Sequence, residues 1–232
     1  MEPPLQAILF LGIIPALFLL YIALKGYEGL YKDKSIFITF IIGIISGVIA
    51  AVVRILLNPP PLIIANIVII DSFTIAYIFL FAFFEQLLKT IVLNIGRLQL
   101  KKETTIYGMS LGLGFGSSFT PFLVIAGSVS GQTSLTFLSL VAFGSLGFIL
   151  FHGASGAYIG YGIFKGKMTR YLFISILLQL PFNVIADLTR SIYPYYIIFQ
   201  FILVIYGALF FIYVLKKVMP QILEKGRKKS KN

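Results

Sequence analysis

Long apolar runs separated by short charged islands dominate the chain. Seven such runs lie at 5–24, 35–57, 72–95, 105–126, 135–163, 171–192 and 195–215. A helix needs about 20 apolar residues to cross roughly 30 Å of hydrocarbon, whereas the strands of a transmembrane barrel are short and alternating. The pattern therefore predicts an all-α polytopic membrane bundle of about seven transmembrane helices.

The composition strengthens this prediction. Of the 232 residues, 59% are hydrophobic and 12% are charged, which is too apolar for a soluble domain. We expect one transmembrane bundle domain over 1–215 and a basic tail over 216–232. The first run lacks a basic leader and a small-residue cleavage site, so we expect it to remain as a span. With no cysteine and one histidine, thiolate chemistry is excluded.

The basic residues are distributed unevenly between the loops. Sixteen of the 19 lie in the first, third and fifth loops and in the tail, a side that the positive-inside rule identifies as cytoplasmic. The N-terminus is then outside and the C-terminus inside, as an odd number of spans requires. The other three are Lys89, inside a run, and Arg54 and Arg190, which we place near the opposite face. We expect a multi-pass protein of the plasma membrane, and the cysteine-free, Ile/Lys-rich composition fits an archaeon or a bacterium.

Two segments fall outside the seven runs. Residues 62–70 are apolar but too short to cross, and we interpret them as a partly re-entrant or interfacial piece. The net charge of +11 comes mostly from the cytoplasmic loops and the tail, so we expect the tail to bind anionic lipid and expect no nucleic acid as a partner.

Among the ionisable residues inside the runs, four matter here, namely Glu85, Lys89, His152 and Asp187. Each costs at least ~2.5 kcal/mol to insert, so each is a candidate for function. Glu85 and Lys89 are four residues apart in the order that favours an ion pair on one helical face. A lone intramembrane histidine is more often a packing residue than a metal ligand, and Glu85 is the expected partner of His152.

A polar stripe marks the sixth run. Gln179, Asn183 and Asp187 follow one another at four-residue spacing and so share one helical face. Lipid offers no hydrogen bonds, so this face must point into the bundle or toward water. We therefore expect it to form part of any site.

Small residues recur every four positions in the fourth and fifth runs. Such faces let two helix backbones approach closely. We expect these two helices to pack tightly through Gly108, Gly112, Gly116, Gly156 and Gly160.

Short motifs follow one another along the chain. They are Ile14-Pro15-Ala16 with Gly26-Tyr27-Glu28, Glu85-Gln86-Leu87-Leu88-Lys89, Gly112-Leu113-Gly114-Phe115, His152 with Gly156 and Gly160, and Gln179-Leu180-Pro181-Phe182-Asn183. In this order they resemble the PrsW family of intramembrane peptidases, which is related to the C-a-a-X prenyl endopeptidase and bacteriocin-processing group. The corresponding family patterns are E-E-x-x-K, F-x-x-x-E and H-x-x-x-N or H-x-x-x-D.

The resemblance implies hydrolysis of a peptide bond within the bilayer, in which carboxylates and histidines bind a metal or activate water and a glutamate is the general base. The positions that match the family are Glu85, Lys89, His152 and Asn183. The positions that depart from it are Gln86, Phe119 and Gln179, where two glutamates and a histidine are expected.

These departures fall on the positions where the family has catalytic residues. Glutamine takes no proton from water at neutral pH, and phenylalanine offers no acceptor. A catalytic zinc usually has three protein ligands, of which Glu85 and His152 supply two. We expect a catalytically degenerate scaffold with no cofactor, in which a polar cavity holds a transmembrane segment or a partner subunit. The expected cavity-lining residues are Gln86, Lys89, Phe119, Gln179, Asn183 and Asp187.

Two alternatives stay open. The first is an active intramembrane endopeptidase, in which Glu85 and His152 activate water directly or bind zinc. The second is a small transporter or channel subunit, whose path runs along Glu85, His152, Gln179 and Asp187.

Overall fold

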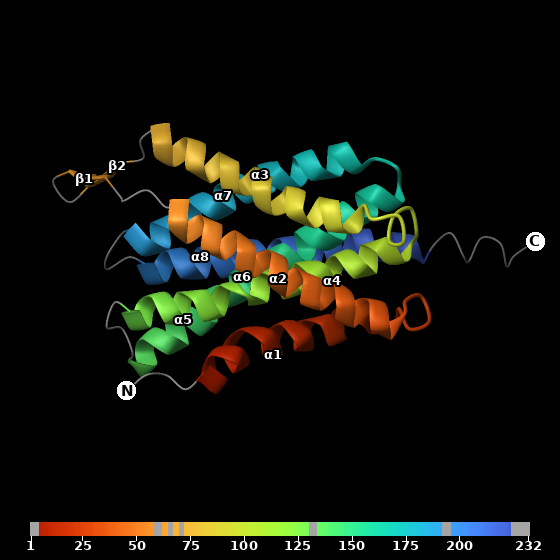
Figure 1. The fold of residues 1–232 in the computed structure, drawn as a ribbon, viewed down its shortest axis with the longest axis horizontal. Helices are drawn as coiled ribbons and strands as arrows, with labels where there is room; N and C mark the ends of the chain where they lie inside the picture. The colour runs from red at the N-terminus through yellow and green to blue at the C-terminus, as the bar shows by residue number, and fades with distance from the viewer. Residues whose placement is uncertain are drawn as a thin grey trace, which may run out of the picture.

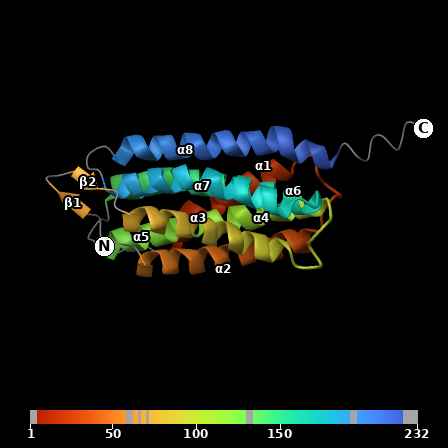
Figure 2. The ribbon, with the colours of Figure 1, turned by 90° about the horizontal axis from the view of Figure 1, so that it is seen from above.

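The computed structural model describes residues 5–57, 62–64, 67–69, 72–129, 134–191 and 196–223. The elements are α1 (Leu5–Leu24), α2 (Asp33–Leu57), β1 (Leu62–Ile64), β2 (Ile67–Ile69), α3 (Ser72–Leu93), α4 (Glu103–Ser117), α5 (Phe119–Val129), α6 (Leu135–Phe164), α7 (Met168–Ser191) and α8 (Tyr196–Tyr213). The helices lie side by side along one axis and alternate in direction, except that α5 continues α4 in the same direction, and α1 begins and α8 ends at opposite ends of the bundle (Figures 1 and 2).

The chain is a multi-pass integral membrane protein with a helical bundle fold. Within the described residues, six helical segments are long and apolar enough to cross a bilayer, and α1 contributes a shorter apolar stretch over Leu11–Leu24. Large apolar side chains such as Phe37, Phe73 and Ile205 are exposed on the outer faces of the helices, where lipid would cover them. These helices coincide with the predicted runs to within a few residues at most boundaries.

The run predicted at 105–126 contains a break. Helix α4 ends at Ser117 and α5 begins at Phe119, although the two together still count as one span from Glu103 to Ile125. Pro121 lacks the backbone N–H that would bond the Ser117 carbonyl, so the helical ladder is interrupted here. The hydroxyl groups of Ser117 and Ser118 bond back to carbonyl oxygens one turn earlier, at 2.7 Å and 2.8 Å.

Residues 62–70 include a short hairpin. Strands β1 and β2 pair antiparallel, with Leu62 opposite Ile69 and Ile64 opposite Ile67. The two strands lie beyond the ends of α2 and α3 (Figures 1 and 2). The strands thus lie outside the helical bundle (Figure 1), and the partly re-entrant or interfacial position of residues 62–70 in the membrane stays a prediction.

Helix α4 is the centre of the bundle, since every residue from Thr104 to Ser117 is buried. Its backbone touches that of α6 at the predicted small residues. A Cβ atom would overlap the backbone of the facing helix at each of Gly108, Gly112, Gly116, Gly156 and Gly160. The close approach brings His152 of α6 directly beside Gly112.

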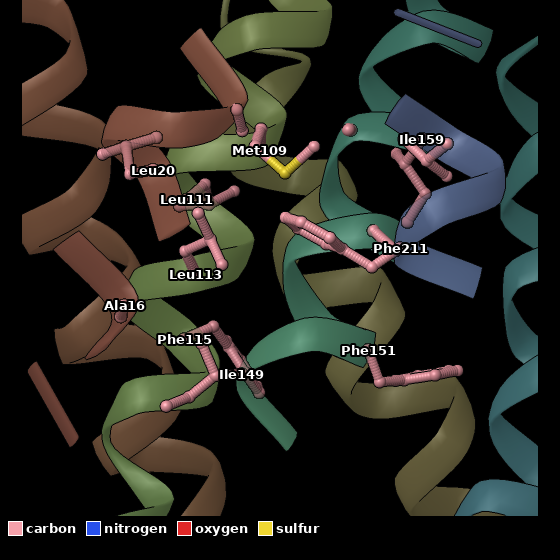
Figure 3. Packing of buried hydrophobic residues seen from close by; sticks show 14 of the residues in the cluster. Ala16, Leu20, Met109, Leu111, Leu113, Phe115, Ile149, Phe151, Ile159 and Phe211 are labelled. Atoms are coloured by element: carbon pink, nitrogen blue, oxygen red, sulfur yellow. The ribbon is translucent and has the colours of Figure 1, made fainter. Parts of the chain in front are cut away.

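Another face of α4 packs on α2 in the same way. A Cβ on Gly114 would overlap the Phe40 carbonyl, and a Cβ on Gly43 would overlap the Leu111 carbonyl. Gly43 therefore packs within this chain. Around these contacts lies a continuous apolar core whose labelled side chains include Leu111, Leu113, Phe115 and Phe151 (Figure 3).

The last helix continues past the predicted end of the bundle. After α8 the chain forms a π-helical segment over Val214–Val218 and a 3-10 turn over Met219–Ile222. Val218, Met219 and Ile222 are buried. The bundle thus extends beyond residue 215, while residues 224–232 of the tail lie outside the described part and its binding to anionic lipid stays a prediction.

Candidate functional site

Polar side chains from α2, α3, α6 and α7 meet inside the bundle. We call this group the polar cluster; it consists of Arg54, Glu85, Gln86, Lys89, His152, Ser155, Gln179 and Asn183, with Asp187 at its rim. All of them except Arg54 and Asp187 have no exposed surface. Charges buried to this extent must be paired or hydrogen-bonded.

Glu85 of α3 is surrounded by donors. Its Oε2 accepts a hydrogen bond from the Gln179 side-chain amide. Its Oε1 lies 3.6 Å from Nη1 of Arg54, and Oε2 lies 3.8 Å from Nε2 of His152. The carboxylate is therefore held by groups from α2, α6 and α7.

The stripe on α7 faces the interior, as its spacing predicts. Gln179 accepts from the Gln86 amide and donates to Glu85, so three side chains form a directed chain of hydrogen bonds. Asn183 donates to the carbonyl of Ile78 at 3.4 Å. The stripe thus fastens α7 to α3 over several helical turns.

Arg54 joins two carboxylates. Its guanidinium lies 3.6 Å from Glu85 and 3.4 Å from Asp187, and its side chain is 8% exposed. Arg54 lies in the last turn of α2, and its predicted position near the opposite membrane face stays a prediction. Its side chain is buried there because two carboxylates compensate its charge. The sequence signal for its membership of the polar cluster is that this arginine lies within an apolar run.

Lys89 bonds to α6. Its Nζ lies 3.0 Å from Nδ1 of His152 and donates to Oγ of Ser155 at 2.7 Å. Within the described residues no Glu85–Lys89 ion pair closer than 4.0 Å is present, so that expectation is wrong. The i, i+4 spacing places both on one face, but each finds a nearer partner on another helix.

Aromatic rings enclose the imidazole of His152. The Phe119 ring stacks on it, with centroids 5.5 Å apart and planes 4° apart, and the Phe115 ring lies at 4.7 Å. Phe119 thus occupies the side of His152 where the resemblance expects a carboxylate. An aromatic ring there offers neither a metal ligand nor a proton acceptor.

The cluster does not fit a zinc ion. Glu85 and His152 are its two candidate ligands, but Lys89 faces Nδ1 of the imidazole and Gln179 donates to the carboxylate. In the described part of the chain, no three His, Asp or Glu side chains gather in a way that could hold a metal. Asp187 pairs with Arg54 instead.

Several deeply buried polar atoms make no hydrogen bond with a described residue. Those in the polar cluster are Oε1 of Glu85, Oε1 of Gln86, Nε2 of His152 and Oδ1 of Asn183. Buried polar atoms normally have a partner, so these are the positions where a water molecule or a polar group of another molecule would bind.

The chain was compared with known proteins in three ways. No family model matches it, no curated protein matches it, and no solved structure matches it. The interpretation of the polar cluster therefore rests on its own geometry.

Proposed function

We propose that the protein is a catalytically degenerate membrane scaffold of the PrsW type, which holds a transmembrane segment or a partner subunit without cleaving it. The resemblance concerned positions far apart in the sequence. Four of these, Glu85, Phe119, His152 and Gln179, come together from α3, α5, α6 and α7. Convergence of this kind supports a shared scaffold.

One observation carries the loss of hydrolysis: the Glu85 oxygen nearer to His152 already accepts a hydrogen bond. A general base must reach the proton of a water molecule with a free lone pair. Oε2 of Glu85 instead accepts from Gln179, and Oε1 faces Arg54 at 3.6 Å. With Phe119 stacked on His152, the geometry supports a closed polar cluster rather than a hydrolytic site.

We further propose seven spans with the N-terminus outside and the C-terminus in the cytoplasm of an archaeal or bacterial cell. The alternation of the helices and the sixteen basic residues on one side support this topology. The same end of the bundle would then face anionic lipid.

Photo-crosslinking tests the binding function. A photoreactive residue replaces Phe84, which lies beside the α3–α7 seam, or Phe18, which is exposed on α1 as a lipid-facing control. The purified chain in lipid is mixed with a defined set of transmembrane segments. We expect adducts at position 84 and few at position 18; equal labelling at both would overturn the proposal.

An active endopeptidase is the second candidate, and the approach of Glu85 to His152 favours it. Oε2 and Nε2 are 3.8 Å apart, and Nε2 has no hydrogen-bond partner among the described residues. A small rearrangement would admit a water molecule between them. This candidate predicts turnover that requires both residues, or zinc bound in a fixed ratio, which metal analysis by mass spectrometry detects.

A transporter is the third candidate, favoured by a continuous string of contacts. Polar groups connect Asp187 through Arg54, Glu85, His152 and Lys89. A proton path would use such a string. Flux into proteoliposomes that disappears in His152→Ala would support this candidate.

A further inference from the structure

The ammonium group of Lys89 is fully buried, and its surroundings account for all three of its hydrogens. Nζ lies 3.0 Å from Nδ1 of His152, donates to Ser155 Oγ at 2.7 Å and lies 5.1 Å from the centroid of the Phe115 ring. An ammonium has three donors and no acceptor, and a ring face attracts a cation. These three groups are the partners that an ammonium at position 89 would have.

This arrangement determines which nitrogen of His152 accepts a hydrogen bond from Lys89. Because an ammonium only donates, Nδ1 must supply a lone pair to Lys89. A neutral imidazole carries its hydrogen on the other nitrogen in that case. Nε2 then bears the hydrogen, and the nearest carboxylate oxygen to it is Oε2 of Glu85 at 3.8 Å.

Ser155 is the second hydrogen-bond partner of Lys89 on α6. Its Oγ accepts from Lys89 and donates its own hydrogen to the His152 carbonyl at 3.1 Å. Both acceptors of Lys89 are thus on one turn of α6. The lysine approaches the imidazole from a defined direction, on the side away from Glu85.

We propose that Lys89 is held as an ammonium and is a positioning residue that fixes His152 in its Nε2–H tautomer. Nε2, which lies 3.8 Å from Oε2 of Glu85, then carries a hydrogen and has no lone pair with which to accept a proton. This inference goes beyond the proposed function, because it holds whether or not the cluster cleaves or binds a segment.

The test uses the fact that His152 is the only histidine of the chain. The full chain is labelled with ¹⁵N-histidine, reconstituted in lipid bilayers and studied by solid-state NMR, where each imidazole nitrogen reports whether it carries hydrogen. We expect hydrogen on Nε2 alone in the wild type. In Lys89→Met we expect a second set of signals with hydrogen on Nδ1.

Ser155→Ala is the matched control, because it removes the other partner of Lys89 and should leave the tautomer unchanged. Hydrogen on Nδ1 or on both nitrogens in the wild type would overturn the proposal, as would identical spectra for the wild type and Lys89→Met. If Lys89→Met does not fold, ¹⁵N-lysine is added to the wild-type label. Magnetisation transfer from one lysine Nζ to Nδ1 is then expected, and its absence overturns the proposal.

Discussion

The Phe119 ring lies flat on the imidazole of His152, with 4° between their planes. The two residues come from α5 and α6, on either side of the loop that joins these helices. The contact covers one face of the only histidine with an apolar ring. The Phe119 ring therefore keeps polar groups and metal ions away from that face of the imidazole.

Restoring ligands at this contact should create a metal site. Phe119→Glu with Gln179→His adds two ligands to Glu85 and His152, and zinc sites need three or four. We expect bound zinc to rise from none in the wild type to about one ion per chain, measured by mass spectrometry of the purified protein. The polar but weakly ligating pair Phe119→Gln and Gln179→Asn is the control, and equal zinc in both double variants would contradict the prediction.

Removal of Arg54 should be strongly destabilising. Arg54→Leu leaves the buried Glu85 without its cation and Asp187 without this partner, and breaking a buried pair from one side costs about 3–5 kcal/mol. We expect a loss of that size in the free energy of unfolding in lipid micelles. The double variant Arg54→Leu with Glu85→Leu should recover much of it, and a double variant as unstable as the sum of the single variants would count against the pairing.

The glycine contacts between α4 and α6 should tolerate no side chain. In Gly112→Ala the new methyl group meets the His152 carbonyl, and overpacking of this kind costs about 1–3 kcal/mol. Gly96→Ala is the matched control, because the nearest heavy atom to its Cβ is 3.8 Å away. Thermal unfolding should separate the two variants; equal midpoints would show that the backbones are farther apart.

The loop after α1 should titrate at low pH. The Gly26 amide donates to both carboxylate oxygens of Glu28, at 3.0 Å and 2.9 Å, and this backbone contact lowers the pKa of Glu28. Because the folded-state pKa lies below the unfolded one, the stabilisation is present above the unfolded value and is lost as the pH falls through the folded value. Carboxyl NMR should give a midpoint below that of an ordinary glutamate, and a midpoint at or above it would refute the contact.

The absence of native cysteine makes the proposed topology simple to test. Single cysteines at the exposed positions Ser134 and Lys167 should react differently with a membrane-impermeant maleimide on intact cells. We expect labelling at position 134 without permeabilisation and at position 167 only after it. The reverse pattern would invert the topology.

Sequence patterns predicted most of the helices because apolar runs of about twenty residues must cross as helices. They did not predict the break at Ser118, because the run around Ser117, Ser118 and Pro121 is still long enough to be interpreted as one span. The sequence patterns also did not predict that residues 62–64 and 67–69 form paired strands. This apolar stretch carries no turn signal strong enough to separate two strands of three residues.

Part of the polar cluster was predictable from the spacing of polar residues along single helices. Helical spacing placed Gln179 and Asn183 on one inward face and identified Glu85 as a neighbour of His152. Spacing within one helix could not show that Lys89 contacts α6 rather than Glu85. Charge counting placed Arg54 near the opposite membrane face but could not show its partners, because only the packing of the helices brings it to two carboxylates.

The most direct test of the account is a cleavage assay in lipid. The wild type, Glu85→Gln and His152→Ala are each incubated with a library of transmembrane segments, and products are detected by mass spectrometry. The account predicts no cleavage by the wild type and no difference between the three proteins. Cleavage by the wild type that both substitutions abolish would contradict it and establish the endopeptidase instead.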